Sequence, residues 1–315
     1  MKALVREPDL GSRHHQELIE KARGLKPIRT AVVHPVDTVS LLGAIKAAEA
    51  GLIEPVLVGP QAAIAAAAAE AKLDLSPYQL VATEHSHASA AQAVALARDF
   101  KVEALMKGSL HTDEFMSAIV AEEKLRTARR MSHVFVIDLP GYPRPLFVTD
   151  AAVIIYPTLE EKVDIVQNAI DLAHVLGLAL PKVAILSAVE TVSSKIRSTI
   201  DAAALCKMAE RGQITGGILD GPLAVDNAVS DEAAKTKGIV SKVAGHADIL
   251  VVPDVEAGNM LAKQLEYLGK AEVAGIVLGA RVPIILTSRA DKTLARHSSC
   301  AIALLLARHT REILP

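Results

Sequence analysis

Short runs of β-branched and aliphatic residues alternate with longer segments of helical period along almost the whole chain. RTAVVHP (29–35) is followed by the helical segment DTVSLLGAIKAAEAG (37–51), and EPVLVGP (54–60) is followed by QAAIAAAAAEAKL (61–73). A Gly, Pro or Asp separates each apolar run from the helical segment that follows it. This alternation predicts a parallel or mostly parallel sheet covered by helices, which is an α/β fold.

The alternation is interrupted between residues 130 and 157. Two extended runs, 132–139 and 145–150, are joined there by a turn rich in Pro and Gly, and this pattern predicts a hairpin. We place a boundary between two α/β domains at this point and expect the last helix, about 292–311, to pack back on the first domain. The expected domains are residues 1–140 with 290–315, and residues 141–289.

The composition argues against several classes of partner. The 315 residues carry a formal net charge of −2, include no Trp and are only 3% aromatic, so the chain lacks the basic surface and stacking rings that nucleic acids require. Cys206 and Cys300 have no disulfide-framework or metal-ligand spacing. The N-terminus lacks the apolar core of a signal peptide, and the longest apolar stretches are too short to span a bilayer. We expect a cytoplasmic protein without a nucleic-acid or membrane partner.

Ligands of open α/β sheets bind beyond the carboxyl ends of the strands, so the loops that follow strands are the candidates for function. KGSLHTDEF (107–115) follows one such strand. Gly108 allows a close approach of the backbone, and Thr112 with Asp113 would cap the next helix and turn its N-terminus toward an anion. Helix capping alone explains the same pattern equally well.

Two other polar stretches leave alternatives open. Arg126, Arg129 and Arg130 precede an apolar strand without an intervening acid, and they predict either a phosphate clamp or a solvated surface. Two later loops carry oxygen ligands that suit either turns and helix caps or a magnesium ion. These residues are Asp220, Asp226, Asn227, Asp254, Glu256 and Asn259.

The segment ILTSRAD (285–291) changes abruptly from an apolar run to a polar turn before the last helical segment. Ser288 and Arg289 stand at the change. A guanidinium there can bind an oxyanion, and a hydroxyl can donate a hydrogen bond to a reacting thiolate. The alternative is an ordinary polar loop.

Five segments taken together resemble the phosphate acetyl/butyryltransferase family, the phosphotransacylases. In family order they are MKGSLHTDEF, RRMSHVFVIDLPGYPRPLFVTDAAVIIYPTLEEKVDI, ITGGILDGPLAVDNAVS, KVAGHADILVVPDVEAGNMLAKQL and GARVPIILTSRAD. The resemblance implies a two-domain, three-layer α/β/α fold like that of isocitrate and isopropylmalate dehydrogenases, with an active cleft between the domains and a homodimeric assembly. It also implies the reaction acyl-CoA + phosphate ⇌ acyl phosphate + CoA by direct transfer, with no metal and no cofactor besides the substrates.

The resemblance also assigns roles to single residues. Phosphate must be held in line with the thioester carbonyl, and Arg289 is the expected clamp. Ser288 would donate a hydrogen bond to the departing sulfur. Acetyl-type members carry an aspartate seven residues beyond this serine, where the chain has Ala295, so Asp291 is the candidate substitute as general base. The expected substrate-binding residues are Arg130, Ser132, Lys107, Gly108, His111, Asp220 and Asn259.

Acetyl-CoA is the favoured acyl donor and butyryl-CoA the alternative. A metal-dependent dehydrogenase of the same fold is a more remote reading, for which Asp220, Asp226 and Asp254 would have to converge. The third reading is a non-catalytic relative that binds CoA or phosphate. It is motivated by Ala295 and by Ile154, which replaces an asparagine of the family pattern.

Overall fold

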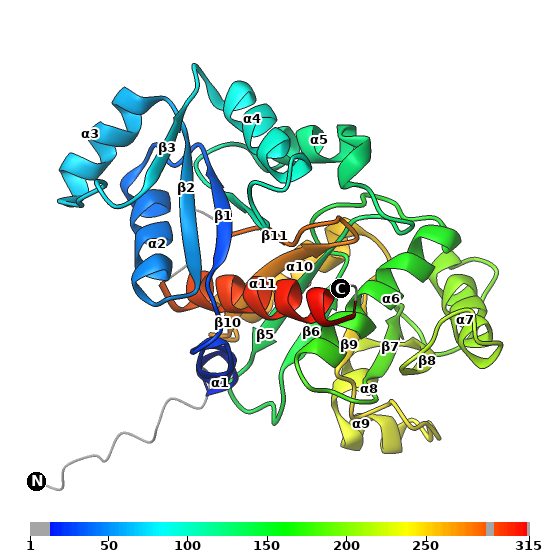
Figure 1. Cartoon of the computed structure of the whole chain (residues 1–315). Helices are drawn as coiled ribbons and strands as arrows, with labels where there is room; N and C mark the ends of the chain where they lie inside the picture. The colour runs from blue at the N-terminus through cyan, green and yellow to red at the C-terminus, as the bar shows by residue number, and fades with distance from the viewer. Residues whose placement is uncertain (1–12, 288–292, 314–315) are drawn as a thin grey trace, which may run out of the picture. The chain divides into compact units, whose positions relative to one another are not determined.

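The computed structural model describes residues 13–287 and 293–313, and the chain divides into two compact units (Figure 1). Unit 1 comprises Met1–Glu17 and Ser132–Val273, and unit 2 comprises Leu18–Met131 and Ala274–Pro315. Helix α1 (Arg13–Ala22) crosses this division. Within the described residues, none of the helices is both long enough and apolar enough to cross a membrane.

Unit 2 contains a sheet in which each strand pairs in parallel with its neighbour, except for an antiparallel pair at one end. The strand order is β3 (Gln79–Ala82), β2 (Ile53–Gly59), β1 (Ile28–Val33), β4 (Ala104–Lys107), β11 (Ile284–Ile285) and β10 (Glu272–Leu278). The antiparallel pair is β10 with β11. The predicted parallel α/β arrangement is confirmed for this unit.

Helices cover both faces of the unit 2 sheet (Figure 1). One face carries α2 (Thr38–Glu49), α3 (Gln61–Ala71) and α11 (Thr293–Ile313). The other carries α4 (Ser86–Arg98) and α5 (Thr112–Ala121), which leads into the short 3-10 helix η2 (Glu123–Leu125). Helix α11 packs on α2 and β11 within unit 2.

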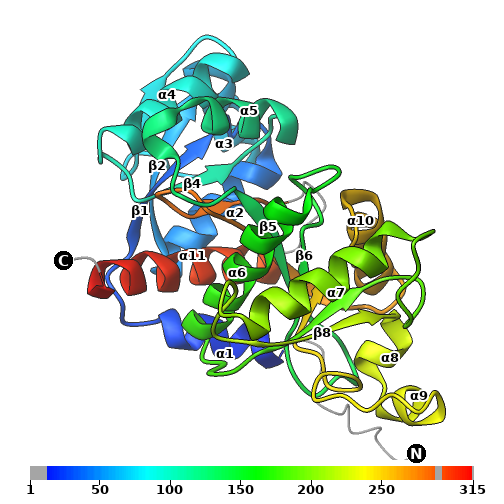
Figure 2. The ribbon, with the colours of Figure 1, turned by 90° about the vertical axis from the view of Figure 1, so that its right-hand side faces the viewer.

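Unit 1 contains a group of strands with helices on both faces (Figure 2). Its strand order is β5 (Ser132–Asp138), β6 (Leu146–Thr149), β9 (Ile249–Val251), β7 (Lys182–Leu186) and β8 (Ile218–Leu223). Helices α6 (Leu159–Val175) and α7 (Arg197–Glu210) pack against each other on one face. The other face carries α8 (Val225–Val229), α9 (Asp231–Thr236) and α10 (Val255–Tyr267). Each unit is therefore a three-layer α/β/α sandwich, as predicted.

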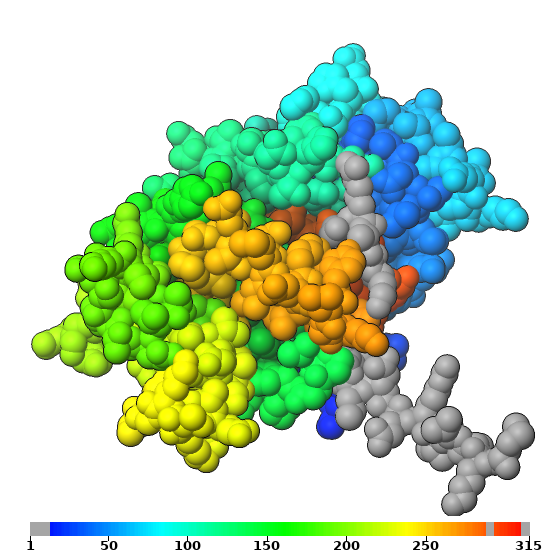
Figure 3. All heavy atoms as spheres, turned by 180° about the vertical axis from the view of Figure 1, so that it is seen from behind, coloured from blue at the N-terminus to red at the C-terminus, as the bar shows by residue number. Residues whose placement is uncertain are grey.

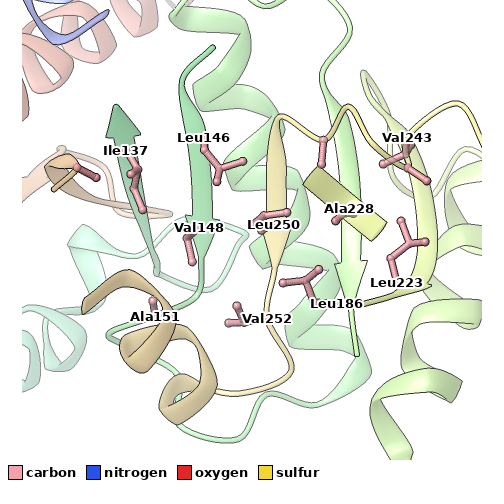
Figure 4. Packing of buried hydrophobic residues seen from close by; sticks show 14 of the residues in the cluster. Ile137, Leu146, Val148, Ala151, Leu186, Leu223, Ala228, Val243, Leu250 and Val252 are labelled. Atoms are coloured by element: carbon pink, nitrogen blue, oxygen red, sulfur yellow. The ribbon is translucent and has the colours of Figure 1, made fainter. Parts of the chain in front are cut away.

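Buried hydrophobic side chains of unit 1 form a core between its strands and the layer of α8, α9 and α10 (Figure 4). Leu146 and Val148 of β6 and Leu250 of β9 face the layer of α8, α9 and α10, because alternate side chains of a strand point to the same face. Each such side chain stabilises the fold by roughly 1.5–3 kcal/mol when it is removed fully from water.

The predicted hairpin is confirmed, because β5 and β6 pair antiparallel with Val134 opposite Thr149 and Ile137 opposite Leu146. The division between units differs from the expected one. Residues from Ala274 onward belong to unit 2, whereas the expected second domain extended to residue 289. The physical reason is strand pairing, since β10 pairs with β11 and β11 pairs with β4.

Candidate functional site

Three parallel strands of unit 2 end at one edge of the sheet. Val33 of β1 lies opposite Lys107 of β4, and Ile285 of β11 lies opposite Met106. The chain that leads to residue 288 therefore leaves the sheet at the edge where Lys107 and Gly108 end their strand. The predicted catalytic residues Ser288, Arg289 and Asp291 lie outside the described residues, so their roles stay predictions.

Gly108 is the point of closest backbone approach at this edge. Its N–H donates to the carbonyl of Val33 at 2.9 Å, and the N–H of Ser109 donates to the carbonyl of His34 at 2.9 Å. A Cβ on residue 108 would lie 2.3 Å from the Val33 oxygen, so only glycine fits here. The expected close approach is confirmed, and substrate binding by Gly108 remains a prediction.

Polar side chains surround this junction. The ring Nδ1 of His34 lies 3.1 Å from Ser89 Oγ, and Asp37 caps α2 by accepting a hydrogen bond from the Ser40 N–H at 2.7 Å. Burial lowers the pKa of His34. Burial acts to raise the pKa of Asp37, but hydrogen bonds from Ser109 and Ser40 outweigh it and hold that pKa below its ordinary value. The junction thus combines a neutral imidazole with an ionised carboxylate near neutral pH.

The expected cap of α5 is wrong. The N-cap is His111, whose exposed side chain makes no capping hydrogen bond, and Thr112 and Asp113 lie inside the first turn. Leu110, the residue before the cap, is buried. Asp113 and Glu114 already place two carboxylates in the first turn, which disfavours binding of an additional anion there.

A buried arginine beside this edge was not anticipated. Arg296 of α11 is 3% exposed, and its Nη1 donates to Thr287 Oγ1 at 3.3 Å. Its side chain lies over Gly43 of α2, where an added Cβ would come within 2.7 Å of the Arg296 Cδ. Thr287 is the last described residue before position 288, so Arg296 anchors the described end of that segment. The sequence offered two indications of this contact: a charged residue in the apolar pattern of the last helix, and a glycine within α2.

The other predicted arginines and Ser132 have different environments. Arg126, Arg129 and Arg130 are exposed, and the Arg130 carbonyl packs against Gly279. Ser132 is completely buried in unit 1 and accepts a hydrogen bond from Asn168 Nδ2 at 2.8 Å. The described contact of Ser132 therefore ties β5 to α6.

The acidic residues considered for a magnesium site each have a different hydrogen-bond or ion-pair partner. Asp220 lies within β8, not after it as expected, and accepts from the Gly221 N–H at 2.8 Å. Asp226 pairs with Lys237 at 3.2 Å, and Asp254 is the N-cap of α10. Across residues 13–287 and 293–309, no three His, Cys, Asp or Glu side chains gather in a manner that could hold a metal ion.

Glu256 and Asn259 lie within α10, not before it as expected, because Asp254 starts the helix. Asn259 is exposed and its Nδ2 donates to the Ala151 carbonyl at 3.4 Å. This contact joins α10 to the loop after β6. Gly258 also packs on Ala151, since a Cβ added to Gly258 would lie 2.9 Å from the Ala151 Cβ.

Asp150 organises this loop, although no sequence pattern had indicated it. Its carboxylate is 3% exposed and accepts hydrogen bonds from the N–H groups of Ala152, Val153 and Ile154 at 3.0, 3.1 and 3.0 Å. Burial raises the pKa of Asp150 to about 6. Ile154 thus contributes its backbone N–H to the turn that directs the chain toward Tyr156.

That loop leads to a cavity of about 420 Å³ in unit 1. The Lys162 Nζ lies 2.8 Å from Asp201 Oδ2 at the cavity, and the Arg197 Nε lies 3.8 Å from the same oxygen. The complete lining is Tyr156, Pro157, Lys162, Arg197, Ser198, Asp201, Pro253 and Asp254. None of these except Asp254 stood out in the sequence, because they come together only through packing.

Solved structures with a similar fold share this architecture. A branched-chain phosphotransacylase from Enterococcus faecalis superposes with a TM-score of 0.76 at 29% identity, covering 89% of this chain and 99% of that one. A 4-hydroxythreonine-4-phosphate dehydrogenase from Klebsiella pneumoniae superposes with a TM-score of 0.54 at 12% identity, covering 89% and 99%. The expected likeness to a dehydrogenase fold is thereby confirmed at the level of fold.

The sequence relatives are more specific. A phosphate acetyltransferase from Rhizobium meliloti is 62% identical over 94% of both chains. A phosphate butyryltransferase from Clostridium beijerinckii is 39% identical over 95% of this chain and 100% of its own. The family model described as phosphate acetyl/butaryl transferase matches residues 81–304. The chain therefore belongs to the phosphate acetyl/butyryltransferase family.

Proposed function

We propose that this chain is a phosphate acetyltransferase that catalyses acetyl-CoA + phosphate ⇌ acetyl phosphate + CoA. The observation that carries the proposal is the 62% identity to a phosphate acetyltransferase over 94% of both chains. Butyryl-CoA is the alternative donor, supported by a relative of lower identity, 39%. The reaction uses two small substrates and no resident cofactor.

The edge of unit 2 that leads to residue 288 supports this chemistry. Lys107 is 6% exposed and Arg296 is 3% exposed, so two buried positive charges lie near the end of the described segment. Phosphate enters as a dianion, and buried cations stabilise such charge more strongly than exposed ones do. Arg289 would clamp the phosphate, and Ser288 would donate a hydrogen bond to the sulfur as the thiolate leaves.

Release of free thiol from acetyl-CoA with and without phosphate tests the proposal. Arg289→Ala should lower kcat/KM for phosphate by about 100-fold, because a charged hydrogen bond is lost. Ser288→Ala should lower kcat while leaving the binding of CoA nearly intact. Arg23→Ala, which removes an exposed arginine just after the end of α1, is the matched control and should leave the rate unchanged. Wild-type rates in both site variants would refute the site assignment.

The acyl donor is tested with a panel of acyl-CoA substrates from two to five carbons. We expect kcat/KM to be highest for acetyl-CoA. A maximum at four carbons would instead identify a phosphate butyryltransferase. A phosphate-independent thiol release with every donor would exclude both assignments.

We also propose that the enzyme works in the cytoplasm as a homodimer, as the family resemblance implies. Helix α10 lies at the surface of unit 1, in orange in Figure 3, and Met260, Tyr267 and Leu268 are exposed apolar side chains on or beside it. Exposed apolar groups of this kind suit an interface between subunits. Light scattering during size-exclusion chromatography should give the mass of a dimer, and a monomer mass would contradict this part of the proposal.

A further inference from the structure

The cavity in unit 1 lies where the first turns of three helices meet. Pro157 precedes the N-cap of α6, Arg197 and Ser198 begin α7, and Asp254 is the N-cap of α10. Helices α6 and α10 are capped by side chains and carry acids in their first turns. Helix α7 has neither a capping side chain nor an acid there. The N-terminus of α7 therefore presents its partial positive charge to the cavity.

The charged side chains of the cavity lining are two cations, Lys162 and Arg197, and two carboxylates, Asp201 and Asp254. Lys162 and Arg197 share a single carboxylate, that of Asp201, at 2.8 and 3.8 Å. Asp254, the other acid of the lining, accepts a hydrogen bond from the Ala257 N–H at 2.9 Å. The Lys162 side chain is 6% exposed and its ion pair fixes the cavity wall, whereas the Arg197 side chain is 76% exposed and accessible to a ligand. An anion, and phosphate in particular, fits this arrangement.

One tyrosine and two prolines also line the cavity, beside the charged side chains. Tyr156 is 69% exposed, and its hydroxyl donates to Glu256 Oε2 at 3.1 Å, which restrains the ring. Pro157 and Pro253 line the same cavity. A restrained aromatic ring beside cations is the combination that binds a base together with its phosphates. The volume of about 420 Å³ lies in the ordinary range of small-ligand sites.

We propose that this cavity binds the phosphorylated adenosine end of a nucleotide and, resting on the proposed function, that the nucleotide is the CoA portion of the substrate. Arg197 and the first turn of α7 would contact phosphate oxygens, and Tyr156 would stack on the adenine. The acyl transfer occurs at the thioester, so this end of the substrate supplies binding free energy remote from the reaction.

The test compares acetyl-CoA with S-acetylpantetheine, which lacks the nucleotide. Arg197→Ala and Tyr156→Ala should each raise KM for acetyl-CoA about tenfold with kcat nearly unchanged, and should leave KM for S-acetylpantetheine unaltered. Arg211→Ala, at the opposite end of α7, is the matched control and should change neither KM. Equal effects on both thioesters, or no effect on either, would overturn the proposal.

Calorimetric titration with adenosine 3′,5′-bisphosphate separates this proposal from the proposed function, because binding requires no turnover. Wild type should bind the bisphosphate, Arg197→Ala should bind it about tenfold more weakly, and the bisphosphate should compete with acetyl-CoA in the rate assay. Binding without competition would reveal a site for a separate effector nucleotide and overturn the assignment to CoA. Binding by a wild type without transferase activity would overturn the proposed function and the assignment to the CoA substrate, but not the nucleotide site itself.

Discussion

Arg296 holds Thr287, the residue that precedes the predicted catalytic residues in the chain. Its guanidinium donates to Thr287, and its side chain lies over Gly43. Arg296→Lys keeps the charge but loses the planar fork, so we expect kcat/KM for phosphate to fall about tenfold. The thermal midpoint should fall by only a few degrees. A purely structural role would show the opposite pattern, a lowered midpoint with wild-type kinetics in the folded fraction.

Buried His133 makes the stability of the fold depend on pH in the acidic range. Its ring is fully buried and packs edge-on against Phe135 with centroids 4.3 Å apart, and neither ring nitrogen has a hydrogen-bond partner among the described residues. Burial lowers the pKa of His133 from 6.5 to about 3. Between these values the unfolded chain binds a proton that the folded chain does not, so stability present above pH 6.5 is lost as the pH falls.

We therefore expect His133 to reduce the free energy of unfolding by about 1.4 kcal/mol per pH unit below pH 6.5. Denaturant unfolding of His133→Phe should show a weaker dependence on pH than wild type in this range. His87→Phe, at an exposed site of α4, is the control and should follow wild type. A pH dependence of His133→Phe identical to that of wild type would contradict the account.

At the scale of elements, Gly108 sets the distance between the ends of β1 and β4. A methyl group there would lie 2.3 Å from the Val33 oxygen, so Gly108→Ala should destabilise the protein by about 3 kcal/mol. Gly51→Ala is a control for backbone strain alone, since its φ is +73° and no atom lies near an added Cβ. It should cost about 1 kcal/mol. Equal shifts of the denaturant midpoint in the two variants would refute a packing role for Gly108.

The sequence predicted which helices and strands form better than it predicted the residues at their ends. The alternation and the β5–β6 hairpin depend on local periodicity, and both are confirmed. The cap of α5 was predicted wrongly, because His111 and neither Thr112 nor Asp113 stands at the N-cap. Lys162 and Asp201 are 39 residues apart in sequence, so no local pattern could have predicted their ion pair at the cavity.

At the scale of the whole molecule, the resemblance predicted family and fold, and both are confirmed. The division into units differs from the one that we expected. A strand of two residues, β11, pairs with β4 and brings the chain from Ala274 onward into unit 2. So short a strand gives almost no periodic signal, which is why the expected boundary lay near residue 289.

Removal of metal ions by a chelator tests the alternative prediction that the chain is a metal-dependent dehydrogenase. The three acids that this reading requires, Asp220, Asp226 and Asp254, have separate partners in the structure. We expect phosphate-dependent thiol release to continue at an unchanged rate after dialysis against EDTA. A loss of activity that Mg²⁺ restores would show that a divalent metal takes part.

The activity that we propose for the chain is transfer of an acetyl group from CoA to phosphate. The most direct measurement follows free thiol and acetyl phosphate together in one reaction of purified protein with acetyl-CoA. We expect the two products to form in equal amounts and only when phosphate is present. Thiol release without phosphate, or without acetyl phosphate, would contradict this proposal.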